Sequence, residues 1–293
     1  MTKLEFERNE KMTKIIVLSD LHLGPSGSVK FGLDTEERFA KALDDINKLY
    51  GDVDMCVFAG DIADEAEPAA YQLFEEMRTR LSMPQFVMLG NHDDRKVYLE
   101  HCKAPMLDPN GYVQGVYEID NTRVVMLDSS EPGHVEGILC PTRLNWLKDQ
   151  LTIAKDRNQQ VVLILHHNPQ KLHMPVDRYS LSEPEKLLSV LKASGVPIPL
   201  IMAGHCHITA AGSWGGYAVV TISGNQHRVA PFLPGMTGQQ ACYEGGAQFG
   251  IIMCEGEHCT VHFHSYVDRN IELPAAMFPW KKDQWQKTPD FLR

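Results

Sequence analysis

Acidic and imidazole side chains stand at the ends of short apolar runs that are typical of buried strands. Asp20 and His22 follow the run at residues 15–18, and a later run ends just before His205 and His207. Because residues two apart point to the same side of an extended chain, each pair can share one metal ion. Either pair alone is a weak signal, since a strand can also end on a solvated Asp or a packing His.

Three further runs end on the same kinds of residue. They are followed by Gly60-Asp61, by Gly90-Asn91-His92-Asp93 and by His166-His167-Asn168-Pro169. In an α/β fold the carboxyl ends of the strands converge on one crevice, so side chains from all these runs can meet there. Such a set of carboxylate, amide and imidazole groups suits two first-row transition-metal ions better than calcium or one structural zinc.

The apolar runs alternate with helical patterns, which predicts an α/β fold. Strands are expected at residues 15–18, 55–59, 85–89, 123–127, 161–165 and 199–203, and helices at 35–50, 68–81, 142–154 and 182–195. In the last helix, Ser182 and Glu185 are expected to form a capping box and Gly195 to stop the helix. After Gly212, alternating stretches at 217–222, 250–253 and 260–266 predict antiparallel strands that complete a second sheet.

The composition of the chain argues against nucleic acid as its binding partner. The chain has 293 residues, with 28 Lys and Arg against 38 Asp and Glu and a formal charge of -10, and no basic cluster that would form a nucleic-acid groove. An anionic phosphate ester would therefore need a strongly positive centre, such as metal ions. The seven cysteines contain no CxxC pair, which predicts reduced thiols in a cytoplasmic protein, and no signal peptide or membrane-spanning run is found.

The candidate ligands stand in the order of a known family signature. The chain resembles the calcineurin-like metallophosphoesterases, whose blocks are D-x-H, G-D, G-N-H-[DE], H and G-H-x-H. The matching residues are Asp20-Leu21-His22, Gly60-Asp61, Gly90-Asn91-His92-Asp93, His166 and Gly204-His205-Cys206-His207. The resemblance covers residues 13–267, which leaves residues 1–12 as an N-terminal extension and residues 268–293 as a C-terminal arm.

Within that family the chain looks most like the bacterial class III cyclic-nucleotide phosphodiesterases and the glycerophosphodiesterases. These carry an Asn-His-Asp-Asp block, an Asp-Ser-Ser block after a central strand and a His-His-x-Pro block, here at residues 91–94, 128–130 and 166–169. The resemblance implies an α/β (α+β) fold: a four-layer β-sandwich of two mixed sheets flanked by helices, with the site at the sheet edges.

The resemblance also implies a binding site for two transition-metal ions, iron, manganese or zinc. One ion would take Asp20, His22, Asp61 and His207, and the other Asp61, Asn91, His166 and His205. Asp61 is the carboxylate flanked by both groups and can bridge them. Two such ions can clamp a phosphoryl group and lower the pKa of a shared water, which then attacks phosphorus in line with the leaving alcohol.

His92 and Asp93 are the candidate catalytic residues. His92 adjoins a ligand without being one, so it can protonate the leaving oxygen or stabilise its charge, and Asp93 is expected to orient a metal-bound histidine. The candidates for substrate contact are His227, Asn225 and His167. His227 matches a pocket histidine of the relatives, with a packing role nearly as plausible, and His167 is expected to pack or hydrogen-bond outside the metals.

These residues together predict a metal-dependent phosphoric diester hydrolase acting on a small molecule, such as a cyclic nucleotide or a glycerophosphodiester. A phosphomonoesterase or broad phosphatase would use the same ligands, because specificity lies in the loops. A metal-free interaction scaffold is the alternative from another class, although no ligand is missing. Close relatives associate, and Trp280 and Trp285 lie among prolines in the C-terminal arm, so at least a homodimer is expected.

Overall fold

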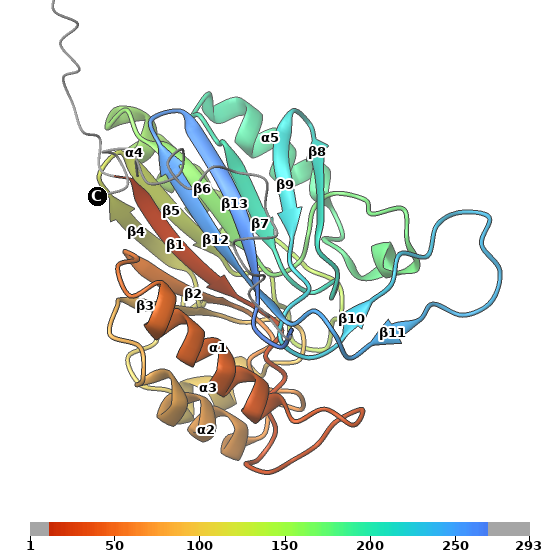
Figure 1. The fold of residues 1–293 in the computed structure, drawn as a ribbon. Coiled ribbons are helices and arrows are strands. Elements are labelled where there is room, and N and C mark those ends of the chain that lie inside the picture. The colour runs from red at the N-terminus through yellow and green to blue at the C-terminus, as the bar shows by residue number, and fades with distance from the viewer. Residues whose placement is uncertain (1–11, 269–293) are drawn as a thin grey trace, which may run out of the picture.

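The computed structural model describes residues 12–268, and two β-sheets form its centre (Figure 1). The first sheet has the strand order β13-β12-β1-β2-β3. Its strands are β1 (Thr13–Leu18), β2 (Met55–Ala59), β3 (Gln85–Met88), β12 (Gln248–Glu255) and β13 (His258–Ser265). The first three of these run parallel, whereas β12 pairs antiparallel with β1 and β13 pairs antiparallel with β12.

The second sheet has the strand order β4-β5-β6-β7-β9-β8. Its strands are β4 (Gly115–Ile119), β5 (Thr122–Leu127), β6 (Gln160–Leu165), β7 (Leu200–Ala203), β8 (Ala210–Trp214) and β9 (Tyr217–Thr221). The inner strands are parallel, and β4 and β8 form antiparallel edges. A small ribbon of β10 (Arg228–Val229) and β11 (Cys242–Tyr243) stands apart, and its connecting loop projects from the body in Figure 1.

Helices cover the outer faces of both sheets. They are α1 (Thr35–Leu49), α2 (Pro68–Arg78) and α3 (Arg95–His101) on the first sheet, and α4 (Pro141–Asp156) and α5 (Pro184–Ser194) on the second, with a 3-10 helix η1 (Pro175–Tyr179) in a loop. Asp34 and Asp94 cap α1 and α3 by accepting backbone N–H groups of the first turn. Proline begins α2, α4 and α5, where its missing N–H costs nothing.

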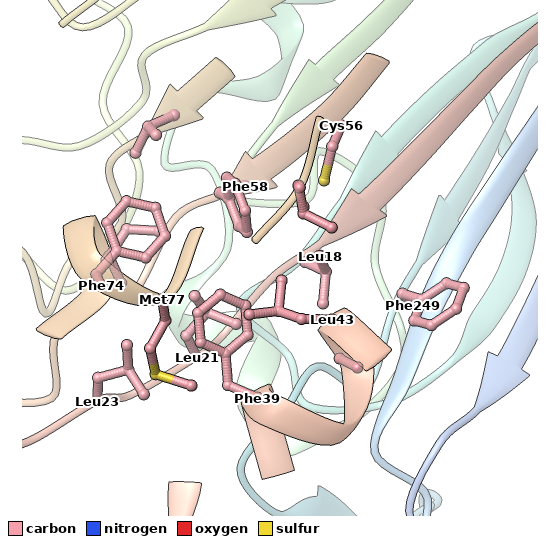
Figure 2. Packing of buried hydrophobic residues seen from close by; sticks show 14 of the residues in the cluster. Leu18, Leu21, Leu23, Phe39, Leu43, Cys56, Phe58, Phe74, Met77 and Phe249 are labelled. Atoms are coloured by element: carbon pink, nitrogen blue, oxygen red, sulfur yellow. The ribbon is translucent and has the colours of Figure 1, made fainter. Parts of the chain in front are cut away.

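Alternation along the strands separates three hydrophobic cores. In β1, Ile16 packs toward α1 and α2, whereas Val17 packs between the two sheets. Figure 2 shows the first of these cores, in which Phe39, Phe58 and Phe74 meet, with the rings of Phe58 and Phe74 4.9 Å apart. A third core lies between the second sheet and α4 and α5. The expected α/β fold, a four-layer sandwich of two mixed sheets flanked by helices, is confirmed.

Two local expectations were wrong. The predicted capping box of Ser182 and Glu185 is absent, because α5 begins at Pro184 with Glu183 as its N-cap and no side-chain cap, although Gly195 ends the helix at a φ of 66° as expected. The late strands do not all complete one sheet. β9 pairs in parallel with β7 in the second sheet, whereas β12 and β13 extend the first sheet beside β1.

The cysteine expectation also needs correction. Cys254 and Cys259 face each other across the β12–β13 hairpin and form a disulfide, while the other five cysteines are free. The strand register explains the disulfide, because the short turn places Cys254 and Cys259 directly opposite one another.

Within residues 12–268, no helix is long and apolar enough to cross a membrane. The predicted C-terminal arm, with Trp280 and Trp285, and nearly all of the N-terminal extension lie outside the described residues.

Candidate metal centre

The carboxyl ends of parallel strands from both sheets meet at one edge of the sandwich. Asp20 and His22 follow β1, Asp61 follows β2, and Asn91 comes after β3 in the same sheet, whereas His166 follows β6 and His205 and His207 follow β7 in the other sheet. These side chains combine into groups whose ligand atoms lie within 4.8 Å of one another: Asp20 with His22 and His207, and Asp20 with Asp61 and His166. Asp20, His22 and His207, predicted for one ion, thus lie together. Of the other predicted set, His166 and His205 fall in one group with His167.

The backbone at this edge adopts an uncommon conformation. The φ angle is positive at five of the candidate ligands, namely Asp20 (54°), His22 (46°), Asp61 (51°), His205 (68°) and His207 (49°). Residues other than glycine seldom occupy this left-handed region, and such strain gathers at functional sites where the surrounding structure holds it in place. The turns thus direct these side chains into the crevice at a cost in backbone energy.

Hydrogen bonds fix how three imidazoles face the crevice. Nδ1 of His22 contacts Asp64 Oδ1 (3.0 Å), Nδ1 of His166 contacts Ala59 O (2.8 Å), and Nδ1 of His207 contacts His227 O (3.1 Å). Because these partners are acceptors, Nδ1 donates in each ring, and Nε2 is the nitrogen left to face the crevice. Outer hydrogen bonds of this kind are what orient histidines in metal sites.

The Asp61 carboxylate lies between the two groups of imidazoles. Its Oδ2 is 3.2 Å from His166 Nε2 and 3.6 Å from His22 Nε2, while His22 Nε2 is only 3.1 Å from His207 Nε2. Two ring nitrogens at this distance must share a proton or a metal ion, because two lone pairs would repel each other. The position of Asp61 therefore suits a carboxylate that bridges two ions.

Several buried polar atoms at this edge lack a hydrogen-bond partner. Within the described part of the chain they include Asn91 Oδ1, His166 Nε2 and His205 Nε2. Leaving a buried acceptor unpaired costs about 1–3 kcal/mol, so such atoms call for an explanation. All three are predicted ligands of the second ion. The residues present therefore fit a pair of metal ions: carboxylate and imidazole groups are available to the first, and an amide oxygen with imidazole nitrogens to the second.

The charges at this edge divide the imidazoles into two kinds. Burial opposes charging His166 and His22, but Asp61 raises the pKa of His166 to about 9 and Asp64 raises that of His22 above its ordinary value. Burial lowers the pKa of His205 to about 4, and burial also holds the pKa of His207 well below its ordinary value. Burial would raise the pKa of Asp61, but the His166 and His22 imidazoles outweigh it and hold that pKa well below its usual range. Asp61 is thus charged, and His205 and His207 keep the lone pairs that a metal needs.

Gly90 allows the two sheets to approach at the site. A Cβ atom at this position would lie 2.6 Å from the backbone nitrogen of Asp61 and 2.6 Å from His166 Nε2, closer than atoms can pack. Only glycine leaves room for the carboxylate and the imidazole together. The glycine of the Gly-Asn-His-Asp block is therefore part of the site geometry and not only of a turn.

His92 lies at the rim of the site with its ring oriented. Its backbone N–H donates to Asp61 Oδ1 (2.9 Å), and its Nδ1 contacts Asp64 O (2.7 Å), which leaves Nε2 on the exposed side. The ring also meets His22 edge-on, with centroids 4.6 Å apart. This arrangement permits proton donation toward the crevice, although ligand atoms of His92, His22 and Asp64 also lie within 4.8 Å of one another.

The expected role of Asp93 was wrong. Its carboxylate accepts hydrogen bonds from the backbone N–H groups of Gly90, Ile62 and Ala63 and from the hydroxyl group of Tyr71, at 2.9–3.1 Å, so it fastens the turns after β2 and β3 together. Among the described residues no histidine contacts it. With both oxygens engaged, Asp93 supports the site as a structural residue and has no free atom for catalysis.

The residue that orients a histidine is Asp64, which the sequence reasoning missed. Asp64 Oδ1 holds His22 Nδ1, and its backbone carbonyl holds His92 Nδ1. Burial opposes ionisation of Asp64, but His22 and Lys30 hold its pKa far below the ordinary value. In the sequence, the feature that could have pointed to Asp64 is its position three residues after Asp61 in the same loop. Surface aspartates are also common at such positions, so this position alone does not predict a contact with a histidine.

Two predicted substrate contacts are also corrected. His167 is fully buried, with Nδ1 bonded to the Ser129 hydroxyl group (2.8 Å) and Nε2 to Val135 O (3.2 Å), so it has no free edge for a substrate, and its ring lies in one group with His166 and His205. Asn225 is equally buried, and its amide donates to Leu21 O and Thr35 O while accepting from the Tyr266 hydroxyl group. Both side chains brace the backbone near the site.

His227 is placed differently from these two. Its ring stacks on His207 with centroids 4.1 Å apart and planes 16° apart, and its Nδ1 contacts Gln226 Oε1 (3.0 Å). The ring is partly exposed and also lines a cavity beside the site. A role in substrate contact is therefore compatible with its position.

Comparisons with known proteins agree with this geometry. Residues 13–209 match the model of the family described as calcineurin-like phosphoesterase. The chain is 33% identical to a cAMP/cGMP dual specificity phosphodiesterase of Mycobacterium tuberculosis over 71% of this chain and 66% of that protein, and 28% identical to a glycerophosphodiester phosphodiesterase of Enterobacter lignolyticus over 72% and 77%. In fold it is similar to a dimetal phosphatase from Danio rerio, with a TM-score of 0.67, 15% identity and coverage of 87% of this chain and 97% of that one. The chain therefore belongs to the calcineurin-like phosphoesterase family and is a metal-dependent hydrolase of phosphate esters.

Proposed function

We propose that this chain hydrolyses a small-molecule phosphodiester at a two-metal centre, with a cyclic nucleotide or a glycerophosphodiester as the substrate class. The observation that carries the proposal is the Asp61 carboxylate between two groups of imidazoles, where among the described residues His205 Nε2 has no hydrogen-bond partner and His166 Nε2 faces only that carboxylate. The relatives named above as phosphodiesterases support the choice of a diester.

The proposed ligands divide into two sets around Asp61. Asp20, His22 and His207 would hold one ion, and Asn91, His166 and His205 the other, with iron, manganese or zinc as candidates. Two bound ions would supply positive charge for the phosphoryl oxygens and lower the pKa of a water at neutral pH. The chain contributes the orientation: outer hydrogen bonds hold the imidazoles, and the His92 amide holds Asp61.

His92 is the proposed proton donor to the leaving alcohol. Its Nδ1 is held by the Asp64 carbonyl, so only Nε2 can face a substrate, and its exposed position lies where the alcohol would depart toward solvent. A group that transfers a proton in the transition state contributes typically about 10²–10⁴-fold to the rate. The leaving oxygen of an alkyl ester is strongly basic, which makes this contribution necessary for natural diesters.

The local charge balance favours a diester over a monoester. A phosphodiester carries one negative charge, whereas a monoester carries close to two at neutral pH. Lys30, on the loop that precedes α1, is paired with Asp64 Oδ2 (2.9 Å) and with Glu65, so its charge is already neutralised. The metal ions would then be the main source of positive charge at the site. They would balance the single negative charge of a diester more easily than the two charges of a monoester.

The test is an assay of metal-reconstituted protein with bis(p-nitrophenyl) phosphate and p-nitrophenyl phosphate. We expect a higher kcat/KM for the diester and loss of both activities after chelation, restored by Mn²⁺ or Fe²⁺. A preference for the monoester would identify a phosphatase instead. Absence of hydrolysis in protein that also binds no stoichiometric metal would favour the scaffold alternative.

We also propose a homodimer or a multiple of dimers in the cytoplasm, where free thiols such as five of the seven here persist, although Cys254 and Cys259 form a disulfide. Leu233 and Met236, on the loop that projects between β10 and β11, are each 52% exposed (Figure 1). Exposed apolar side chains on a projecting loop are typical of an association surface. Sedimentation at micromolar concentration should give a dimer or larger species, and a monomer would contradict this.

A further inference from the structure

A cavity of about 200 Å³ adjoins the proposed metal centre on the side of His207. It is lined by Phe31, Leu33, His227, Cys242, Tyr243 and Glu244. His227 connects the two places, because its ring stacks on that of His207 and also forms part of the cavity wall. A substrate whose phosphate lies at the metal centre can therefore extend across His227 into this cavity.

Phe31 is presented to the cavity by a constrained turn. The backbones of Lys30 and Leu33 bond to each other in both directions, at 3.0 and 2.8 Å, and Phe31 and Gly32 between them have φ angles of 53° and 76°. A phenylalanine at positive φ is unfavourable, and its side chain is 81% exposed. Its ring nevertheless stands edge-on to His227, with centroids 5.9 Å apart.

The turn is also tied to the metal centre. Lys30 Nζ lies 2.9 Å from Asp64 Oδ2, and the other oxygen of Asp64 holds His22. The position of Phe31 relative to the candidate ligands is thus set by ion pairing and by the backbone, not by contacts of the phenyl ring in a core. An apolar ring kept exposed beside a catalytic centre is best explained by contact with a ligand.

Tyr243 supplies a second aromatic side chain. Tyr243 lies on β11 opposite Arg228 of β10, and Arg228 is the residue that follows His227 in the chain. The Arg228 guanidinium lies 5.8 Å from the centroid of the Tyr243 ring. Tyr243 is 52% exposed, so its ring also has a free face. Two exposed aromatic rings from separate segments therefore flank the cavity that begins at His227.

The chemistry of the lining limits what the cavity can hold. Its volume is below the roughly 300–1,000 Å³ of sites for whole drug-sized ligands, so it suits a single ring system. Glu244 is the charged group among the lining residues, and a carboxylate repels a second anionic group while accepting hydrogen bonds from N–H groups. A glycerol or ethanolamine group would gain little from two aromatic rings, whereas a planar base stacks on them.

We infer that Phe31 and Tyr243 form a specificity subsite for an uncharged heteroaromatic group of the substrate, such as the base of a cyclic nucleotide. This inference rests on the proposed phosphodiesterase activity and selects between its two substrate classes. The rings act by binding the base and leave the reacting atoms to the metal centre.

The experiment compares 3′,5′-cyclic AMP with glycerophosphoethanolamine, an aliphatic diester, in metal-loaded protein. Phe31→Ala and Tyr243→Ala should each lower kcat/KM for cyclic AMP on the order of 10-fold, mainly through KM, because each removes one stacking surface. Hydrolysis of glycerophosphoethanolamine should change little, and Phe31→Trp should retain the activity on cyclic AMP. Tyr179→Ala, which removes an exposed tyrosine of η1 outside the cavity, is the matched control.

Adenosine supplies a readout that does not depend on turnover. It should bind the wild-type protein in calorimetry and inhibit glycerophosphoethanolamine hydrolysis, and Phe31→Ala should weaken both effects. Equal losses for the two diesters in the variants, or no loss for either, would overturn the subsite. Wild-type protein that cleaves the aliphatic diester but neither cleaves cyclic AMP nor binds adenosine would overturn it while leaving the proposed function intact. If no diester is cleaved, the proposed function fails, and adenosine binding then decides the subsite alone.

Discussion

Replacing Asp61 with alanine is expected to remove both metal ions together and to abolish hydrolysis. Asp61 Oδ2 lies 3.2 Å from His166 Nε2 and 3.6 Å from His22 Nε2, so it is the carboxylate that both proposed ion positions share. Without it, the two sets of imidazoles would face each other with less negative charge to hold the cations. Loss of an outer hydrogen-bonding partner alone lowers metal affinity by about 10–100-fold, and loss of a bridging ligand should exceed that.

The measurement is the metal content per chain after reconstitution and desalting. Asn91→Ala is the matched control, because its side chain contributes one neutral oxygen to one proposed ion, so it should weaken mainly that ion and leave the other near full content. Asp61→Asn keeps an oxygen for the His92 backbone N–H and tests whether the charge, and not that hydrogen bond, holds the ions. Near-full content at either position in Asp61→Ala would contradict a bridging role.

Replacing His92 with alanine should spare the metals and slow the chemistry. The contact of His92 with Asp61 is made by its backbone N–H, which the substitution preserves, whereas the imidazole contacts the Asp64 carbonyl and the edge of His22. If the imidazole protonates the leaving oxygen, kcat for an alkyl diester should fall about 10²–10⁴-fold. Nitrophenolate leaves without a proton, so bis(p-nitrophenyl) phosphate should lose much less.

The two substrates must be compared in preparations of verified metal content. His92→Asn is a useful second variant, because its amide can restore the contact with the Asp64 carbonyl without a titrating group. A large loss for the alkyl diester that both variants share points to proton transfer. Equal losses for alkyl and aryl diesters would make His92 a positioning residue, and loss of metal would place it among the ligands.

The sequence by itself determined the layers and the candidate ligand set. Strand runs such as residues 55–59 are apolar on both faces, because each strand lies between a helix layer and the other sheet. A continuous apolar run in the sequence is therefore enough to predict a buried strand. The spacing of Asp20 with His22, and of His205 with His207, is equally local. Such features depend on neighbours along the chain, and the structure brings these residues together at one edge.

Only the tertiary structure decided the contacts between distant segments. The role of Asp93 depends on backbone N–H groups about 30 residues away, and the partners of Asn225 lie about 190–204 residues away. Asp64 was missed as the partner of His22 for the same reason, since 42 residues separate them. Of the late strands, β9 joins its near neighbours β7 and β8, whereas β12 pairs with β1 at the other end of the chain. These hydrogen bonds form between groups that are close only in the folded chain. The local residue pattern around either partner does not indicate which distant group it will meet.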